Sequence, residues 1–295
     1  MKSFTSIQPR SFFWVACVIA SIAITRFATA ADAPAKPAVD PGPNFLIGVW
    51  YQPLSSFDKW KARGVNTLVG YPENSENISR EQWLAAAKKA GFYYIAKPTE
   101  DPDDIKSDLA DDHFLAWEQQ DEPDGAGATP ADKIQEKYKA WKQLGNKNVL
   151  LNLDGPRFQY SKPADYIPYC QGADWLAFDY YVLNRGDGPA NLKKIGEAID
   201  LLKQWSGGKK KIFVFIECSD QDLRISDFGA LKGLDGQPIG TKMRGPTPDE
   251  MKAEIDIAVQ HGAAGIVYFP QVIGKGWENF DGTTTDVETA GLQRF

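Results

Sequence analysis

The sequence is poor in histidine, with two among its 295 residues. His113 stands just before an apolar stretch that reads as a strand, and His261 stands just before Gly262, where a helix is expected to end. Both histidines are therefore expected at the starts of strands, away from a site built at the strand ends. We expect no histidine-based metal centre, no Ser-His-Asp triad, and no bound metal or cofactor.

Cysteine is also scarce. Cys17 lies in an N-terminal apolar run, which leaves Cys170 and Cys218 in the rest of the chain. Export of the protein would permit a disulfide. The expected arrangement of strands puts Cys170 and Cys218 at opposite ends of neighbouring strands, which is too far apart for such a bond. We expect both thiols to be reduced and packed.

Long hydrophobic runs are missing beyond FFWVACVIASIAIT (12–25). Basic residues precede this run, and the small-x-small triplet Ala-Thr-Ala (28–30) follows it. A membrane-spanning helix needs about 20 apolar residues, so the run predicts a cleaved signal peptide over 1–30, with an uncleaved anchor as the alternative. A Pro/Ala-rich linker follows at 31–44. We expect a secreted or periplasmic protein.

An excess of positive charge is absent as well. Removal of 1–30 takes away three basic residues and no acidic ones, which leaves 30 basic and 39 acidic residues and a net charge of −9. Nucleic acids and anionic membrane surfaces favour positively charged partners. We therefore expect no nucleic-acid partner, and no membrane partner after signal cleavage.

From residue 45 onward, short β-rich runs alternate with helical patterns, which is typical of parallel β-α units. The strand-to-helix links are long, above all 219–246, as they are on the active face of a (β/α)8 barrel. We predict a single-domain α/β protein, a (β/α)8 TIM barrel over 45–295 with a short final helix. An open doubly wound sheet is the alternative, but no glycine-rich phosphate turn follows the first strand. The predicted strands are 45–51, 66–71, 93–98, 114–120, 148–154, 175–181, 211–217 and 265–271.

Several predicted helices carry strong start signals. Ser79 with Gln82 and Thr247 with Glu250 have the spacing of capping boxes. Thr129 before a proline predicts a further N-cap. These signals support the division of the chain into alternating elements.

Two glutamates end predicted strands that lie across the barrel mouth from each other. Glu122 follows the fourth strand, in AWEQQDEPDG (116–125), and Glu217 ends the seventh. Cleavage of a glycosidic bond needs such a pair, because one carboxyl protonates the leaving oxygen and the other attacks the sugar carbon or activates water. We expect Glu122 to be the acid/base and Glu217 to be an ionised nucleophile held by hydrogen bonds. Glu118 reads as a structural acid lower in the strand.

The segment WEQQDEP (117–123) resembles the W-E-x-x-N-E-P motif that ends the fourth strand in clan A retaining glycoside hydrolases, and FIECS (215–219) resembles their nucleophile segment. The chain over 45–290 is also similar to a poorly characterised bacterial group of secreted glycoside hydrolases, for example in DYIPYCQGADWLAFDYY (165–181). The resemblance implies a (β/α)8 barrel that cleaves O-glycosidic bonds in an oligo- or polysaccharide with retention of configuration.

The sequence departs from the clan A pattern at two positions. Asp121 stands where the motif has an asparagine that donates a hydrogen bond to the sugar 2-hydroxyl. An ionised aspartate accepts such a bond but cannot donate it. After the second strand, Glu73 stands where many clan A enzymes carry an arginine.

Other polar residues near predicted strand ends are candidates for binding the carbohydrate. For each one, packing within the barrel or at its rim is the alternative role. The candidates are Gln52, Asp121, Asn152, Asp179, Tyr181, Arg244 and Tyr268.

Two other functions stay open. Asp154, Asp179 and Glu217 end three successive strands, and such carboxylates can hold Mg²⁺ in a metal-dependent barrel enzyme. The second alternative is a non-catalytic barrel that binds glycans or another protein, which Asp121 and the short final helix favour.

Overall fold

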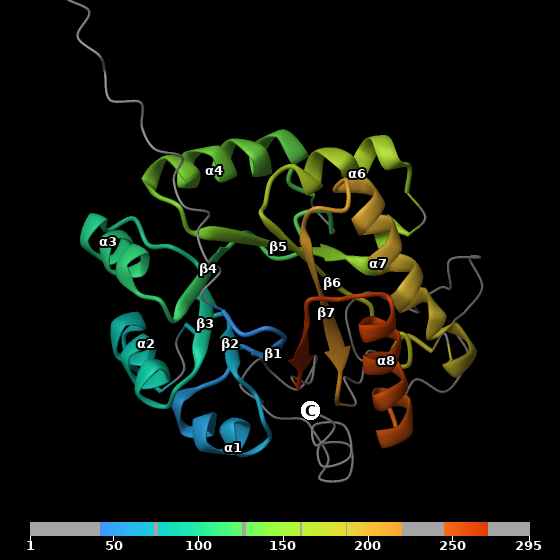
Figure 1. Cartoon of the computed structure of the whole chain (residues 1–295), viewed down its shortest axis with the longest axis horizontal. Helices are drawn as coiled ribbons and strands as arrows, with labels where there is room; N and C mark the ends of the chain where they lie inside the picture. The colour runs from blue at the N-terminus through green and yellow to red at the C-terminus, as the bar shows by residue number, and fades with distance from the viewer. Residues whose placement is uncertain are drawn as a thin grey trace, which may run out of the picture. The chain divides into compact units, whose positions relative to one another are not determined.

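The computed structural model describes residues 42–73, 76–125, 128–159, 161–186, 188–219 and 245–270. In this part of the chain, eight parallel strands pair in chain order and β8 pairs with β1, so the sheet closes into a barrel (Figure 1). The prediction of a (β/α)8 TIM barrel is confirmed, and the doubly wound alternative is wrong. The strands are β1 (Leu46–Trp50), β2 (Thr67–Val69), β3 (Tyr93–Ala96), β4 (Phe114–Glu118), β5 (Asn148–Asp154), β6 (Trp175–Asp179), β7 (Lys211–Glu217) and β8 (Gly265–Phe269).

Helices surround the barrel (Figure 1). Each connection between consecutive described strands contains at least one of them, as parallel neighbours require. They are α1 (Phe57–Ala62), α2 (Arg80–Lys89), α3 (Pro102–Ala110), α4 (Ala131–Leu144), α5 (Gly155–Phe158), α6 (Pro163–Cys170), α7 (Lys193–Trp205) and α8 (Pro248–Gln260), with 3-10 turns η1 (Leu54–Ser56) and η2 (Pro189–Asn191).

Every predicted strand contains an observed one. The bounds of β5 and β7 agree with the predicted 148–154 and 211–217. The other strands end earlier than predicted, because their last polar or aromatic residues already belong to the loops at the mouth. The predicted short final helix lies outside the described residues.

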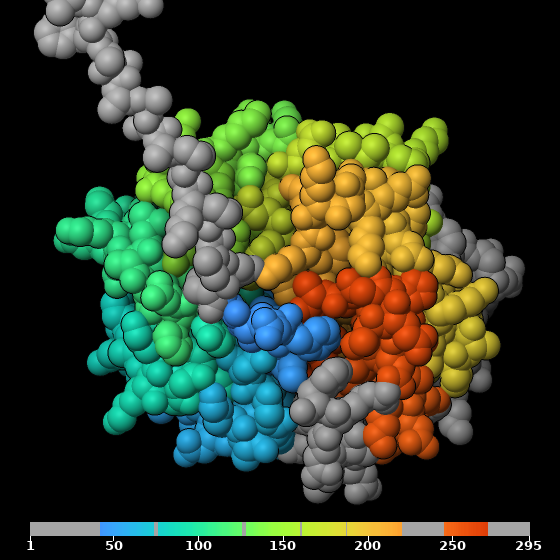
Figure 2. Space-filling model, in the orientation of Figure 1, coloured from blue at the N-terminus to red at the C-terminus, as the bar shows by residue number. Residues whose placement is uncertain are grey.

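Two apolar layers hold the barrel together, because side chains alternate between its interior and its exterior. The interior layer includes Trp50 and Phe215, whose ring centroids are 5.3 Å apart in an edge contact. The exterior layer, between the strands and the helices, includes Trp60, Trp83 and Trp117, all without solvent exposure. In Figure 2, residues early in the chain and residues of β8 and α8 lie side by side at the centre of the face shown, where β1 pairs with β8.

Both predicted capping boxes are present, at Ser79 with Gln82 and at Thr247 with Glu250. The prediction for Thr129 is wrong, because the N-cap of α4 is Pro130 and the Thr129 hydroxyl donates instead to Gln120 Oε1 at 3.0 Å. A proline at the N-cap moves the helix start one residue further along the chain.

The two cysteines in the described residues, Cys170 and Cys218, are buried and are not joined in a disulfide, as expected. His113 precedes β4 and His261 caps the end of α8, so both lie at the starts of strands, as expected. Among the described helices, none combines the length and the apolar character needed to cross a bilayer.

Candidate active site at the carboxyl ends of the strands

The carboxyl ends of β4, β5 and β6 bring acidic and amide side chains together at the barrel mouth. By the alternation along each strand, Glu118, Asn152 and Asp179 point inward, on the same face as the interior apolar layer. Asp121 and Glu122 follow β4 in the next loop. The group is therefore assembled from three successive strands, as active sites in this fold are.

Glu122 lies in a strained turn. Its φ is +39°, in the left-handed region that non-glycine residues rarely adopt. The turn is closed by the Gly125 amide, which donates to the Glu122 carbonyl at 2.9 Å. A side chain at Gly125 would place its Cβ 3.0 Å from that same carbonyl oxygen, so glycine fits the turn. Strained backbone of this kind collects at functional sites.

The side chain of Glu122 is hydrogen-bonded to that of Asp179. Burial, the charge of Glu122 and this hydrogen bond raise the pKa of Asp179 well above its ordinary value. A hydrogen bond between two carboxyl groups requires a proton, so the two carboxyl groups share one. The two residues form a proton-sharing pair, which we call the Glu122–Asp179 pair.

Asp121 and Asn152 form the next contact. Asn152 Nδ2 donates to Asp121 Oδ1 at 2.9 Å. Asp121 reaches solvent, yet the protein crowded around its carboxylate removes enough water to raise its pKa to about 6, helped by the charge of Glu122 and opposed by the Asn152 bond. Asp121, which stands where the clan A motif has asparagine, is thus held by an amide donor from the neighbouring strand.

Glu118 lies deeper, with 3% of its surface exposed. Burial and then the charge of Asp121 raise its pKa to about 8, against the opposing charges of Lys97 and Lys137. Its side chain lines a cavity of about 300 Å³ together with Tyr51, Tyr71, Glu73, Arg80, Lys97, Pro98 and Thr99. Glu118, expected as a structural acid lower in the strand, also forms part of a cavity wall.

Glu217 belongs to a different hydrogen-bond network. Its Oε1 accepts from the Leu183 amide at 2.7 Å, and its Oε2 accepts from the Asn184 amide at 2.8 Å and from Asn184 Nδ2 at 2.6 Å. The side chain has no solvent exposure. Burial raises the pKa of Glu217, while bonds from Glu254, Leu183 and Asn184 oppose the rise. These donors form a closed cradle around the carboxylate, and none of them belongs to the Glu122–Asp179 pair.

Glu254 is a residue that the sequence reasoning missed. It lies on the buried face of α8, with 1% of its surface exposed, beside Met251, Ile255 and Ala258. Burial and the charge of Glu217 raise the pKa of Glu254 well above its ordinary value. The signal was present, because an acid at this position interrupts the apolar stripe of an amphipathic helix.

The other predicted binding residues fall into separate places. Tyr181 lies at the mouth and stacks on Phe269, with ring centroids 5.1 Å apart. Gln52 is fully buried in the helix layer, where its Oε1 accepts from Trp60 Nε1 at 2.6 Å. Tyr268 is fully buried in the same exterior layer. Arg244 lies outside the described residues. The structure thus groups Asp121, Asn152, Asp179 and Tyr181 with Glu122, and it places Gln52 and Tyr268 away from the mouth.

The three carboxylates of the metal-binding alternative are used differently. Asp154 caps α5 by accepting from the Arg157 amide at 3.2 Å and pairs with the Arg157 side chain at 3.3 Å. Within the described ranges, no three histidine, cysteine or acidic side chains are grouped so as to hold a metal ion. The strand positions of Asp154, Asp179 and Glu217 therefore do not assemble a metal centre.

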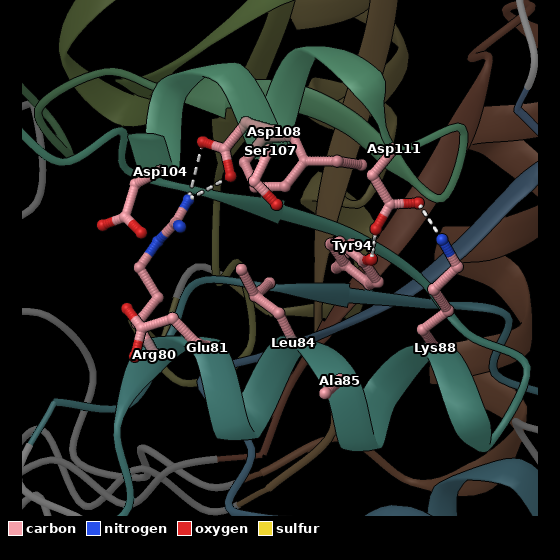
Figure 3. Close-up of a pocket in the computed structure, with 11 residues that line it drawn as sticks. Arg80, Glu81, Leu84, Ala85, Lys88, Tyr94, Asp104, Ser107, Asp108 and Asp111 are labelled. Atoms are coloured by element: carbon pink, nitrogen blue, oxygen red, sulfur yellow. Dashed lines mark hydrogen bonds and ion pairs between the residues drawn. The ribbon is translucent and has the colours of Figure 1, made fainter. Parts of the chain in front are cut away.

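A second cavity, of about 220 Å³, lies between α2 and α3 on the outside of the barrel (Figure 3). Its charged groups largely pair with one another: Arg80 Nη2 lies 2.8 Å from Asp108 Oδ2, and Lys88 Nζ lies 2.8 Å from Asp111 Oδ1. These ion pairs join the two helices, and we treat this cavity as a feature of their packing.

The fold and the position of the polar cluster define a closed (β/α)8 barrel with a candidate site at the carboxyl ends of its strands. No protein-family model matches the sequence. No curated protein matches it either. The fold, in contrast, is shared with many solved structures.

Among the similar structures are glycoside hydrolases. A glucosidase from Croceicoccus marinus has a TM-score of 0.55 at 12% identity, with 86% of this chain and 67% of the other covered. A glycoside hydrolase family 17 β-1,3-glucanosyltransferase from Rhizomucor miehei has a TM-score of 0.51 at 14% identity, covering 85% and 100%. The GH5_18 protein from Bifidobacterium longum subsp. longum has a TM-score of 0.51 at 9% identity, with 85% of this chain and 78% of the other covered. At these identities the likeness is one of fold.

Proposed function

We propose that the chain is a glycoside hydrolase that cleaves O-glycosidic bonds in an oligo- or polysaccharide at the mouth of the barrel. The observation that carries the proposal is the Glu122–Asp179 pair, a strained and protonated carboxyl pair at the strand ends of a barrel that glycoside hydrolases also adopt. Function in this fold resides in the strand-end residues, so the pair counts for more than the fold alone.

In the proposed reaction, Glu122 exchanges a proton with the glycosidic oxygen. Asp179 shares a proton with Glu122, and it fixes the direction of the Glu122 carboxyl by their hydrogen bond. Asn152 holds Asp121 beside them, ready to accept a hydrogen bond from a sugar hydroxyl. A shared proton, held by a carboxyl whose pKa is raised, suits general acid catalysis.

Glu217 completes the proposal as the nucleophile of a retaining mechanism, the role that its strand position indicates. The N–H donors of Leu183 and Asn184 favour its ionised form, which a nucleophile needs. Attack on a sugar requires the carboxylate to turn out of the cradle, because the side chain is fully buried within it. The loop that carries Leu183 and Asn184 would have to move with this step.

The proposal includes export. The basic start, the apolar run at 12–25 and the Ala-Thr-Ala triplet at 28–30 support a cleaved signal peptide and a secreted or periplasmic enzyme. Such a location suits a hydrolase whose polysaccharide substrates lie outside the cytoplasm. N-terminal sequencing of the exported protein tests the cleavage site after residue 30.

The first test is turnover by the Glu122→Gln variant. We expect kcat/KM on the best substrate from a panel of aryl glycosides and polysaccharides to fall by about 10²–10⁴-fold, because the amide cannot deliver a proton. Proton NMR of the first product should show retained anomeric configuration. Glu136→Gln, which removes one exposed carboxylate from α4, is the matched control. Equal, slow release of reducing sugar by wild type and Glu122→Gln would favour the non-catalytic glycan-binding barrel.

A further inference from the structure

The cavity beside Glu118 has an acidic wall. Glu118 and Glu73 line it, and the charge of Asp121 acts on Glu118 from the neighbouring part of the mouth. Two phenol rings, of Tyr51 and Tyr71, complete the wall on the side of β1 and β2. Burial and then the charge of Asp121 raise the pKa of Glu118 to about 8, so the ionised form of Glu118 is costly in this cavity.

The positive charges at the cavity do not balance these acids. The Arg80 guanidinium donates to both oxygens of Asp108, at 3.0 and 2.8 Å, and is thereby neutralised from the side of α3. Lys97 is exposed, and its charge lowers the pKa values of Glu118 and Asp121 without returning either to its ordinary range. A further cation in the cavity would be stabilised by this imbalance.

Unpaired hydrogen-bond acceptors at the mouth also favour a ligand with N–H donors. Two inward side chains, each more than nine-tenths buried, keep one oxygen without a partner: Glu118 Oε2 and Asn152 Oδ1. Among the described residues, the unpaired atoms of Glu118 and Asn152 are acceptors, and Arg80 Nε on the cavity wall is one buried N–H donor without a partner. A buried acceptor without a partner is costly, so the mouth favours a ligand rich in donors.

We propose that the mouth takes a sugar bearing a protonated amine, an oligosaccharide of glucosamine type, with the ammonium group hydrogen-bonded to Glu118. The inference rests on the proposed function for its sugar substrate. An ammonium group has three N–H donors and a positive charge, so it satisfies both the unpaired acceptors and the charge imbalance. A hydroxyl group satisfies the acceptors alone, and an acetylated amine has lost the charge.

The test is binding measured without turnover. Isothermal titration compares a fully deacetylated glucosamine tetrasaccharide with its N-acetylated form and with a glucose tetrasaccharide. We expect the deacetylated ligand to bind about tenfold tighter or more. Its binding should also release protons, seen as a dependence of the measured heat on the buffer, because the ammonium group lowers the pKa of Glu118.

Glu118→Gln should remove most of this preference, since it keeps the shape of the side chain and loses its charge. Glu136→Gln removes the same charge from the exposed surface of α4 and should bind as the wild type does. Equal affinity of the wild type for the three ligands overturns the inference. An equal loss of the preference for the deacetylated ligand in Glu118→Gln and Glu136→Gln also overturns it. The wild-type comparison decides the matter even if Glu118→Gln does not fold.

The outcomes separate this inference from the proposed function. Preferred binding of the deacetylated ligand without any cleavage would keep the inference and contradict the hydrolase. Cleavage of neutral and amino oligosaccharides at equal kcat/KM would keep the hydrolase and contradict the inference.

Discussion

At the scale of the residue, the two glutamates singled out in the sequence have opposite surroundings. Glu122 is partly exposed in a strained turn, whereas Glu217 is fully buried and bound by three N–H donors. The N–H donors hold the Glu217 carboxyl firmly and favour its ionised form, while burial raises its pKa. The cradle therefore gives Glu217 a structural role that exists whether or not it attacks a sugar.

Both roles of Glu217 can be measured in one variant. Glu217→Gln puts an amide N–H against the donors of Leu183 and Asn184, so we predict that the free energy of unfolding falls by about 1–3 kcal/mol. If Glu217 is also the nucleophile, kcat falls by about 10³-fold or more in the protein that is folded. Urea denaturation and single-substrate kinetics measure the two effects.

Asn184→Ala is the control for this variant, because it removes a donor to the same carboxylate and leaves the carboxylate itself. Full turnover by folded Glu217→Gln would show that Glu217 is not the nucleophile. Its role would then be to hold the loop after β6 through its hydrogen bonds. Unchanged stability would contradict the cradle.

The sequence predicted where Glu122 and Glu217 stand along their strands, because strand ends can be found from patterns of apolar residues. It did not predict which way each side chain turns. For Glu122, the direction depends on its left-handed φ. For Glu217, it depends on the amides of Leu183 and Asn184, which lie 34 and 33 residues earlier in the chain. No local sequence pattern reveals either feature.

At the scale of the element, α8 packs apolar side chains against the barrel and also carries a buried acid, Glu254. Its start was read from the capping box of Thr247 and Glu250, and its buried face includes Met251 and Ile255. Glu254 occupies a position on that same face and meets Glu217. The pattern of the helix predicted its existence, but the buried acid becomes intelligible only once β7 is packed against it.

Glu254 gives the protein a pH-dependent stability whose sign follows from its raised pKa. The folded state holds the Glu254 proton more tightly than the unfolded state, so this contribution is largest below the unfolded pKa of about 4.3. It is lost as pH rises toward the folded pKa, which lies well above that value. The folded protein must otherwise bury two negative charges side by side.

We predict that Glu254→Gln, which keeps an N–H donor toward Glu217, removes this dependence. The free energy of unfolding of the variant relative to wild type should rise between about pH 5 and about pH 8. Chemical denaturation at the two pH values measures the difference. A relative stability that stays the same at both values would show that Glu254 does not hold a proton in the folded protein.

At the scale of the whole molecule, closure of the barrel is what creates the site. β4 and β6 are not neighbours, since β5 pairs with both, and the curvature of the closed sheet turns their inward residues toward one another. The alternation of strands and helices in the sequence was enough to predict the barrel. The contact between Glu122 and Asp179 was beyond that reasoning, because it depends on the curvature of the sheet and on a strained loop. Asp179 was expected to bind sugar or, in the metal-dependent alternative, Mg²⁺.

The Glu122–Asp179 pair is the central claim, and the pH profile of kcat/KM in wild type and in Asp179→Asn tests it most directly. In the wild type, loss of the shared proton leaves two carboxylates in contact, so the alkaline limb lies at raised pH. In Asp179→Asn the second carboxylate is gone. We predict that the alkaline limb moves to lower pH by about one unit or more. An alkaline limb at the same pH in both proteins would contradict the pair.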